Sequence, residues 1–179
     1  IKSEKGTFDR FRNRIMFPIF NTSGKVIAFG GRALASEDPA KYLNSPETVL
    51  YRKRDNFYGL NASRKHIREK ENVIIVEGYM DFLQLYQAGI QNVIALSGTA
   101  LTENHAMKIR KFTKQVFLAY DGDSAGIDAS IRAGYILLKL GIDPEIISVP
   151  NKMDPDDWVK RSGPDEFNNA LGNSTPALK

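Results

Sequence analysis

The second half of the chain alternates short apolar runs with amphipathic segments, and this pattern most restricts what the chain can fold into. The apolar runs have the length of buried strands, and the segments between them carry apolar residues at helical spacing. A repeated order of strand and helix predicts a mostly parallel sheet with right-handed crossovers, flanked by helices. The predicted strands are residues 72–76, 93–96, 115–120 and 145–149. The predicted helices are residues 80–88, 102–112, 125–140, 155–161 and 164–171.

The first 70 residues follow a different pattern. Residues 14–20 and 25–30 are rich in β-forming residues and flank a cluster of turn formers, which predicts a hairpin. The pair Gly30-Gly31 is expected to break its second strand, and residues 32–58 predict a long loop. We therefore expect an α/β fold in three parts. These are a smaller α+β lobe (residues 1–70, called the basic lobe), a parallel-sheet domain with its following short helices (residues 71–171) and a tail (residues 172–179).

Charge is distributed unevenly between these parts. Residues 1–70 hold 15 Lys and Arg against 7 Asp and Glu, whereas the remaining residues hold 10 against 14. A basic surface beside a concentration of carboxylates favours a polyanionic partner, although two solvated surfaces of opposite bias would give the same counts. The chain has no cysteine, which excludes disulfides and cysteine zinc sites from it. No apolar run approaches the roughly 20 residues of a membrane span, so we expect a cytoplasmic protein without a membrane partner.

Acidic residues follow three of the four predicted strands. Glu77 follows the first strand, Asp121 and Asp123 follow the third, and Asp154 and Asp156 follow the fourth. The carboxyl ends of parallel strands meet at one edge of a sheet, where ligands bind in open α/β folds. Carboxylates gathered there would repel one another without cations, and Mg²⁺ prefers such oxygen ligands. The pattern therefore predicts a divalent metal site suited to phosphoryl transfer.

Each acidic segment also has an ordinary explanation when it is taken alone. Asp121-Gly122-Asp123 is a common turn sequence, and Asp154-Pro155-Asp156 is typical of a helix start with proline at its first position. Their joint placement after the strand ends favours the metal site. Asp81 lies one helical turn beyond Glu77 and would join the same acidic cluster.

The chain resembles the Toprim domain shared by topoisomerases and bacterial primases, which has a Glu after its first strand and Asp-x-Asp after its third. More narrowly, it resembles the catalytic core of bacterial replicative primases of the DnaG type. The most specific stretch is Lys41-Tyr42-Leu43-Asn44-Ser45-Pro46-Glu47-Thr48, and the resemblance extends from Phe8 to Leu171. The other matching segments are Arg10–Ile19, Phe29–Arg32, Glu77–Asp81, Gly98–Thr102 and Asp121–Gly126.

This resemblance implies synthesis of short RNA primers on single-stranded DNA from ribonucleoside triphosphates during DNA replication. Such an enzyme is a DNA-directed RNA polymerase, a nucleotidyltransferase that uses Mg²⁺ or Mn²⁺. The implied catalytic carboxylates, which also bind metal, are Glu77, Asp121 and Asp123. The further implied metal ligands are Asp81, Asp154 and Asp156. The residues implied to bind template or nucleotide are Arg10, Arg12, Arg32, Lys41, Asn44 and Lys53.

The resemblance also implies parts outside this chain. A cysteine-containing zinc domain is expected upstream, so zinc is expected only there, and a region that binds the replicative helicase is expected downstream. We interpret the chain as a monomeric fragment of a longer primase whose product is the RNA primer. Within the fragment, Arg10, Arg12 and Arg14 alternate, so in an extended segment they would form one strip for phosphates. The same arginines would equally suit a solvated strand edge, where charge prevents pairing with other strands.

Two other classes of function compete with this interpretation. Another Toprim enzyme, a nuclease or a topoisomerase, would use the same carboxylates. A topoisomerase would need a catalytic tyrosine on another domain, and nothing in the sequence marks Tyr79 or Tyr120 for that role. The other class is a non-catalytic α/β module, either a nucleotide sensor that regulates a replication complex or a domain that resembles a signalling receiver. A receiver would place its phosphate-accepting carboxylate at Asp121. Such a receiver would not carry a basic lobe rich in aromatic residues.

Overall fold

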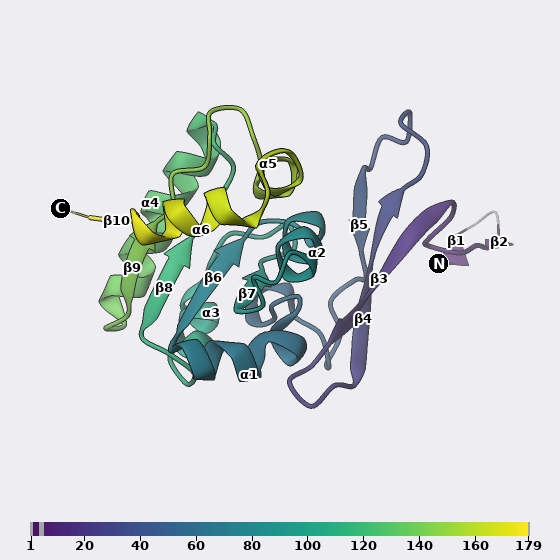
Figure 1. Cartoon of the computed structure of the whole chain (residues 1–179). Helices are drawn as coiled ribbons and strands as arrows, with labels where there is room; N and C mark the ends of the chain where they lie inside the picture. The colour runs from purple at the N-terminus through teal and green to yellow at the C-terminus, as the bar shows by residue number, and fades with distance from the viewer. Residues whose placement is uncertain (1, 4–5, 179) are drawn as a thin grey trace.

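A five-stranded sheet forms the centre of the parallel-sheet domain in the computed structural model, which describes residues 2–3 and 6–178 (Figure 1). Its spatial order is β10-β9-β8-β6-β7. The strands are β6 (Asn72–Val76), β7 (Val93–Ala95), β8 (Gln115–Leu118), β9 (Asp143–Ile146) and β10 (Thr175–Pro176). Strands β6 to β9 run parallel, and β10 pairs antiparallel with β9. The prediction of a mostly parallel sheet is confirmed.

Helices cover both faces of this sheet, which explains why its strands are continuous apolar runs. The helices are α1 (Leu60–Lys70), α2 (Tyr79–Gln87), α3 (Glu103–Ile109), α4 (Ser124–Lys139), α5 (Pro155–Ser162) and α6 (Pro164–Gly172). Alternate strand residues point to opposite faces. Ile75 and Leu118 belong to the core cluster with α1, α3 and α4, whereas Ile74 and Val76 belong to the cluster with α2, α5 and α6.

The basic lobe contains an antiparallel sheet in the order β3-β4-β5, which lies beside α2 (Figure 1). Its elements are β1 (Lys2–Ser3), β2 (Gly6–Thr7), β3 (Arg14–Phe20), β4 (Val26–Ala33), β5 (Tyr42–Asn44) and the 3-10 helix η1 (Lys53–Asp55). A third core cluster joins Phe17 and Ile19 of β3 to Tyr79 of α2. The backbone of Tyr58 exchanges two hydrogen bonds with Ala95 of β7, so the basic lobe covers that edge.

The structure corrects the sequence analysis in the basic lobe. The pair Gly30-Gly31 does not break the second strand, because β4 continues through both glycines and pairs with β3 and β5. A Cβ atom at Gly30 would lie 2.6 Å from the ring of Tyr79, so this glycine leaves room for an aromatic side chain of the other domain. The stretch predicted as a loop contains β5 and η1.

The division of the chain at residue 70 stays a prediction. Helix α1, which that division assigned to the basic lobe, packs on the parallel sheet through Leu60 and Ile67. In the predicted tail, Thr175 and Pro176 form β10 and pair with β9. Across the described residues, we find no helix with the length and apolar character needed to cross a membrane.

Candidate active site

A cavity of about 670 Å³ lies between the carboxyl edge of the parallel sheet and the basic lobe. This central cavity has two walls of opposite charge. Its acidic wall carries Glu77, Asp81, Asp121 and Asp154. Its basic wall carries Arg10, Lys41 and Lys53, together with Asn44. The structure therefore brings together eight of the twelve residues that the sequence analysis selected. The other four, which are not part of the cavity lining, are Arg12, Arg32, Asp123 and Asp156.

Two carboxylates of the acidic wall, Asp81 and Asp154, lie at the starts of helices, as does Asp123 outside the cavity lining. The Asp81 carboxylate accepts hydrogen bonds from the backbone N–H of Gly78 (2.9 Å) and of Asp156 (3.2 Å), so it joins the first turns of α2 and α5. Asp123 caps α4 by accepting from the N–H of Gly126 at 2.8 Å. Asp154 caps α5 in the same way. Such carboxylates satisfy N–H groups that a helix leaves unpaired and interact favourably with the helix dipole.

The carboxylates of this wall lie within one another's electrostatic field. Burial, together with the charge of Asp154, raises the pKa of Asp81 to about 7. Burial also raises the pKa of Asp121 to about 6, with the charges of Glu77 and Asp154 acting in the same direction and Lys41 opposing them. The pKa of Glu77 is raised, first by burial and then by the charges of Asp81 and Asp123. Ionising the whole wall is therefore costly without added positive charge.

Three carboxylates at the start of α5 fit a metal ion most directly. Asp154, Asp156 and Asp157 each offer an oxygen, and these oxygens lie within 4.8 Å of one another. One carboxylate oxygen of Asp156 is buried and has no hydrogen-bond partner, while the other accepts from Lys160 Nζ at 2.7 Å. Hard oxygen ligands suit Mg²⁺ and similar ions. Asp157 was not among the selected residues, although it directly follows Asp156 in the acidic run.

The three carboxylates that the sequence analysis expects to be catalytic are less compact than the three at the start of α5. In the described residues, Glu77, Asp121 and Asp123 do not bring three oxygens within the same 4.8 Å. Glu77 and Asp121 both line the central cavity, whereas Asp123 is exposed and caps α4. A shared role for these three carboxylates stays a prediction.

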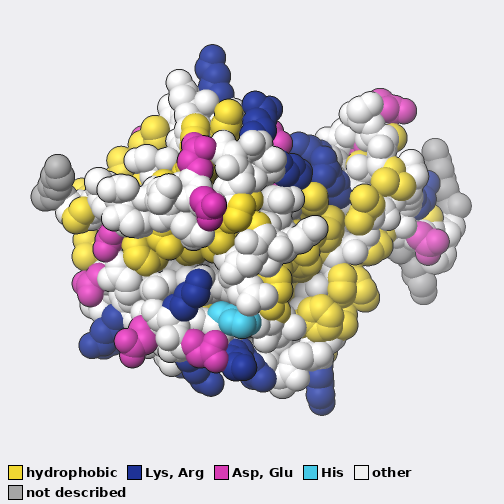
Figure 2. Space-filling view, in the orientation of Figure 1, with side chains coloured by type: hydrophobic (Ala, Val, Ile, Leu, Met, Phe, Trp, Pro, Cys, Tyr) yellow, Lys and Arg dark blue, Asp and Glu magenta, His cyan; other side chains and the backbone are white. Residues whose placement is uncertain are grey.

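The basic wall combines fixed and free cations. Figure 2 shows Lys and Arg side chains gathered where the basic lobe meets the parallel-sheet domain. Arg10 donates to the backbone carbonyl of Asn44 through Nε (3.1 Å) and Nη2 (2.9 Å). By contrast, the ion pairs found among the described residues include neither Lys41 nor Lys53. These two ammonium groups are therefore available to pair with phosphate.

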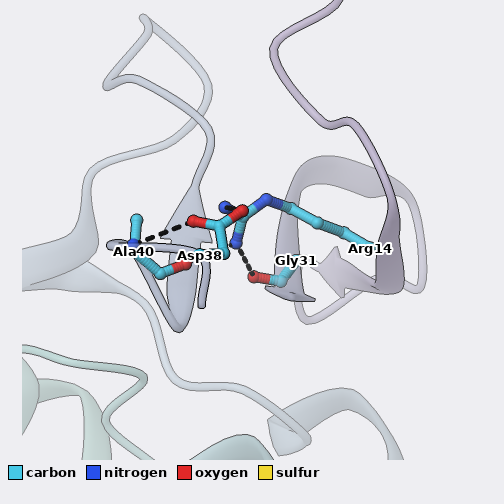
Figure 3. A network of polar contacts seen from close by, with 4 residues as sticks. All are labelled: Arg14, Gly31, Asp38 and Ala40. Carbon is cyan, nitrogen blue, oxygen red and sulfur yellow. Dashed lines mark hydrogen bonds and ion pairs between the residues drawn. The ribbon is translucent and has the colours of Figure 1, made fainter. Parts of the chain in front are cut away.

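The predicted arginine strip does not form. Asn13 has a φ of 52°, so the segment is not extended and the three arginines do not share one face. The Arg14 side chain is only 6% exposed and pairs with Asp38 at 2.7 Å (Figure 3). Arg14 also donates to the carbonyl of Ala40 at 2.7 Å. It therefore holds the loop before Lys41 in place and does not present its charge to a ligand.

Arg32 lies at a second, smaller opening of about 340 Å³, which shares Lys41 with the central cavity. Arg12 lies outside both openings, and its guanidinium is 5.7 Å from the centre of the Phe8 ring. The structure thus separates the six basic and polar residues selected from the sequence into a group inside the central cavity and two arginines beyond it.

Comparison with known proteins identifies the family. Residues 1–64 match the family model for the N-terminal domain of the DNA primase catalytic core, and residues 74–159 match the Toprim-like family. The DNA primase of Clostridium acetobutylicum is 45% identical over 178 residues, or 99% of this chain. The chain belongs to the DnaG-type primases. It spans 30% of the length of the C. acetobutylicum primase and 26% of that of the Listeria monocytogenes primase, to which it is 45% identical over 160 residues.

Solved primase structures share the fold of this DnaG-type chain. A structure of the Aquifex aeolicus primase, described by its zinc-binding and RNA polymerase domains, has a TM-score of 0.90 and 39% identity; the match covers 96% of this chain and 43% of that one. A DnaG primase catalytic domain bound to single-stranded DNA has a TM-score of 0.90 and 38% identity, over 99% of this chain and 58% of that one. The Toprim-like domain of this primase chain implies divalent metal binding, which agrees with the carboxylates on α5.

Proposed function

We propose that this chain is the part of a DNA primase that joins ribonucleotides on a single-stranded DNA template. The observation that carries the proposal is the central cavity, which has carboxylates on one wall and unpaired lysines on the other. A ribonucleoside triphosphate needs both, because its phosphates pair with lysine and with cations held by carboxylates. The solved relative described as bound to single-stranded DNA supports the choice of template.

In this proposal the residues of the two walls have separate roles. Mg²⁺ or Mn²⁺, when bound, supplies positive charge at the reacting phosphate and lowers the pKa of the attacking hydroxyl. Glu77, Asp121 and Asp123 are the proposed catalytic carboxylates, and Asp81, Asp154 and Asp156 are proposed to hold a further ion. Lys41, Lys53 and Arg10 would bind triphosphate. Arg12 and Arg32, which lie outside the central cavity, would contact the template strand.

The remaining partners are proposed from family membership. The RNA primer is the product, and the replicative helicase and zinc would bind the full-length protein outside these residues. We also propose that these residues are monomeric, and that they divide into the basic lobe and the parallel-sheet domain.

The buried tyrosines near the central cavity argue against the alternative of a topoisomerase that uses a tyrosine of this chain. Tyr79 is 2% exposed and Tyr120 is 5% exposed. Burial raises the pKa of both hydroxyl groups above the usual range of tyrosine, which opposes formation of a nucleophilic phenolate. Neither tyrosine is suited to attack a DNA backbone.

Primer synthesis by the full-length protein tests the proposal. The assay follows incorporation of labelled ribonucleotides on single-stranded DNA with Mg²⁺ or Mn²⁺. We expect Asp121→Asn to lower the rate by about 100-fold or more, since it removes a charge that faces the reacting phosphates. The matched control is Asp128→Asn, which alters an exposed carboxylate on α4 outside the central cavity. A near-normal rate with Asp121→Asn would contradict the proposal.

A further inference from the structure

Asn44 is held between the two parts of the chain and is not turned freely into the cavity. Its Oδ1 accepts a hydrogen bond from the Tyr79 hydroxyl at 2.6 Å, and its Nδ2 donates to the carbonyl oxygen of Ser97 at 3.1 Å. Asn44 ends β5 of the basic lobe, whereas Tyr79 and Ser97 belong to the parallel-sheet domain. One amide side chain therefore makes two polar contacts across the boundary.

Both partners of Asn44 adjoin the strand end that presents Glu77. Tyr79 is two residues beyond Glu77 and begins α2. Ser97 follows β7, has a φ of 60°, and donates its backbone N–H to the carbonyl of Glu77 at 2.9 Å. Asn44 is thus linked to the Glu77 backbone in two ways: through Tyr79, two residues along the chain, and through Ser97, which is hydrogen-bonded to Glu77.

The surrounding packing makes this arrangement specific. The Tyr79 ring stacks on Phe17 with centroids 4.9 Å apart and meets Tyr58 edge-on at 4.7 Å. Gly30 leaves the space that the ring occupies. Because packing fixes the ring, the hydroxyl can meet its acceptor only where Asn44 stands.

The chemistry of the two contacts requires an amide. The side chain must accept from a phenol and donate to a carbonyl at the same time, which asparagine does and aspartate does not. Asp at position 44 would keep the acceptor for Tyr79 but would place a carboxylate oxygen against the carbonyl oxygen of Ser97.

We propose that Asn44 is a positioning residue that fixes the basic wall relative to the acidic wall, and that its side chain is not a nucleotide contact. This inference rests on the proposed function, since it assigns Asn44 a part in the same reaction. The backbone carbonyl of Asn44 also accepts hydrogen bonds from Arg10. Asn44 therefore orders a cation of the basic wall as well as the backbone that adjoins Glu77 of the acidic wall.

The test separates kcat from KM in primer synthesis by the full-length protein. We expect Asn44→Asp and Asn44→Ala to lower kcat by about 10- to 100-fold while the KM for ribonucleoside triphosphate stays within about twofold, because misplacement of reacting groups by about 1 Å has effects of this size. Tyr79→Phe should lower kcat in the same direction, and adding it to Asn44→Ala should cause little further loss, as expected of contacting partners.

The control is Asn21→Ala, which changes another asparagine of the basic lobe. Asn21 accepts hydrogen bonds from the N–H groups of Ser23 and Lys25 at the hairpin turn. Its loss should lower thermal stability without lowering kcat. The proposal is overturned if Asn44→Asp raises the KM with kcat unchanged, or if it changes neither constant.

A second measurement keeps this proposal separate from the proposed function. If the wild-type full-length protein makes no primers, the proposed function fails, and hydrogen exchange then decides the role of Asn44. We expect Asn44→Asp to speed amide exchange at residues 78–82 and 96–98 and to leave α4 unchanged. Unchanged exchange in both segments would reject the positioning role.

Discussion

The turn between Asp121 and Asp123 gives the sharpest prediction, because the loop before Asp154 lies directly against it. A Cβ atom at Gly122 would lie 2.1 Å from the carbonyl oxygen of Pro150 and 2.8 Å from that of Val149. Both obstacles are backbone atoms, and the loop is held there by two hydrogen bonds, from the Gly122 N–H to Met153 and from the Lys152 N–H to Gly122. No side-chain rotation can make room for a methyl group at this position.

The size of the effect follows from these distances. Ordinary van der Waals contacts begin near 3.4 Å, so Gly122→Ala requires a backbone shift of about 1 Å or more. Overpacking of this kind costs about 1–3 kcal/mol of folding free energy. Either direction of movement displaces a carboxylate, namely Asp121 on one side or Asp154 on the other. Displacement by about 1 Å lowers kcat by about 100-fold.

The assays are primer synthesis and thermal unfolding of the full-length protein. Gly172→Ala is the matched control, because a Cβ atom at this last residue of α6 would meet no heavy atom within 4 Å. We expect the control to retain full activity and to be equally or slightly more stable, since alanine favours a helix more than glycine does. If Gly122→Ala matched the wild type in both kcat and Tm, the reasoning from close approach would be refuted.

Three further predictions concern charge. With metal removed by EDTA, the free energy of unfolding should fall as the pH rises from about 4 to 7. Asp81 should contribute at most about 4 kcal/mol to this fall, because its pKa is about 7 in the folded protein and near 3.9 in the unfolded chain. Asp81→Asn should remove this part of the pH dependence in urea unfolding measured across that range. Arg14→Ala should destabilise the protein by about 2 kcal/mol and speed proteolysis in residues 34–41, and Asp38→Asn should have a smaller effect in the same direction. If the Arg14→Ala variant and the wild type were cleaved at the same rate, Arg14 would not hold this loop in place. Arg12→Ala should reduce the salt slope of single-stranded DNA binding by about 0.7 if it contacts one phosphate, and an unchanged slope would place Arg12 off the template path.

The parallel sheet could be predicted because its signal is local and repeated. Alternating apolar strands and amphipathic helices determine the sheet, and the sheet determines where strand ends meet. Glu77 and Asp121 line the same cavity, which agrees with the meeting of strand ends that this topology requires. The ends of the elements were less accurate, since the predicted strand over residues 145–149 is observed as Asp143–Ile146.

The errors concern contacts between residues far apart in sequence. Arg14 pairs with Asp38, 24 residues away, and no periodicity indicates that pair. The sequence predicts a strand break at Gly30, because the ring that requires this glycine belongs to Tyr79, which is distant in sequence. The side-chain contacts of Asn44 are equally distant in sequence, since its partners lie 35 and 53 residues further along the chain. The nucleotide-binding role that the resemblance implies for Asn44 stays a prediction.

The two hydrogen bonds between Tyr58 and Ala95 also affect how the protein can be divided. Strand β7 lies at the edge of the five-stranded sheet, and its backbone N–H and C=O groups would be exposed without the basic lobe. Exposed sheet edges recruit strands from other molecules. We therefore expect a shortened protein that begins at residue 71 to self-associate through β7. By covering the edge of β7, the basic lobe also prevents the sheet from pairing with a strand of a neighbouring molecule and so opposes aggregation.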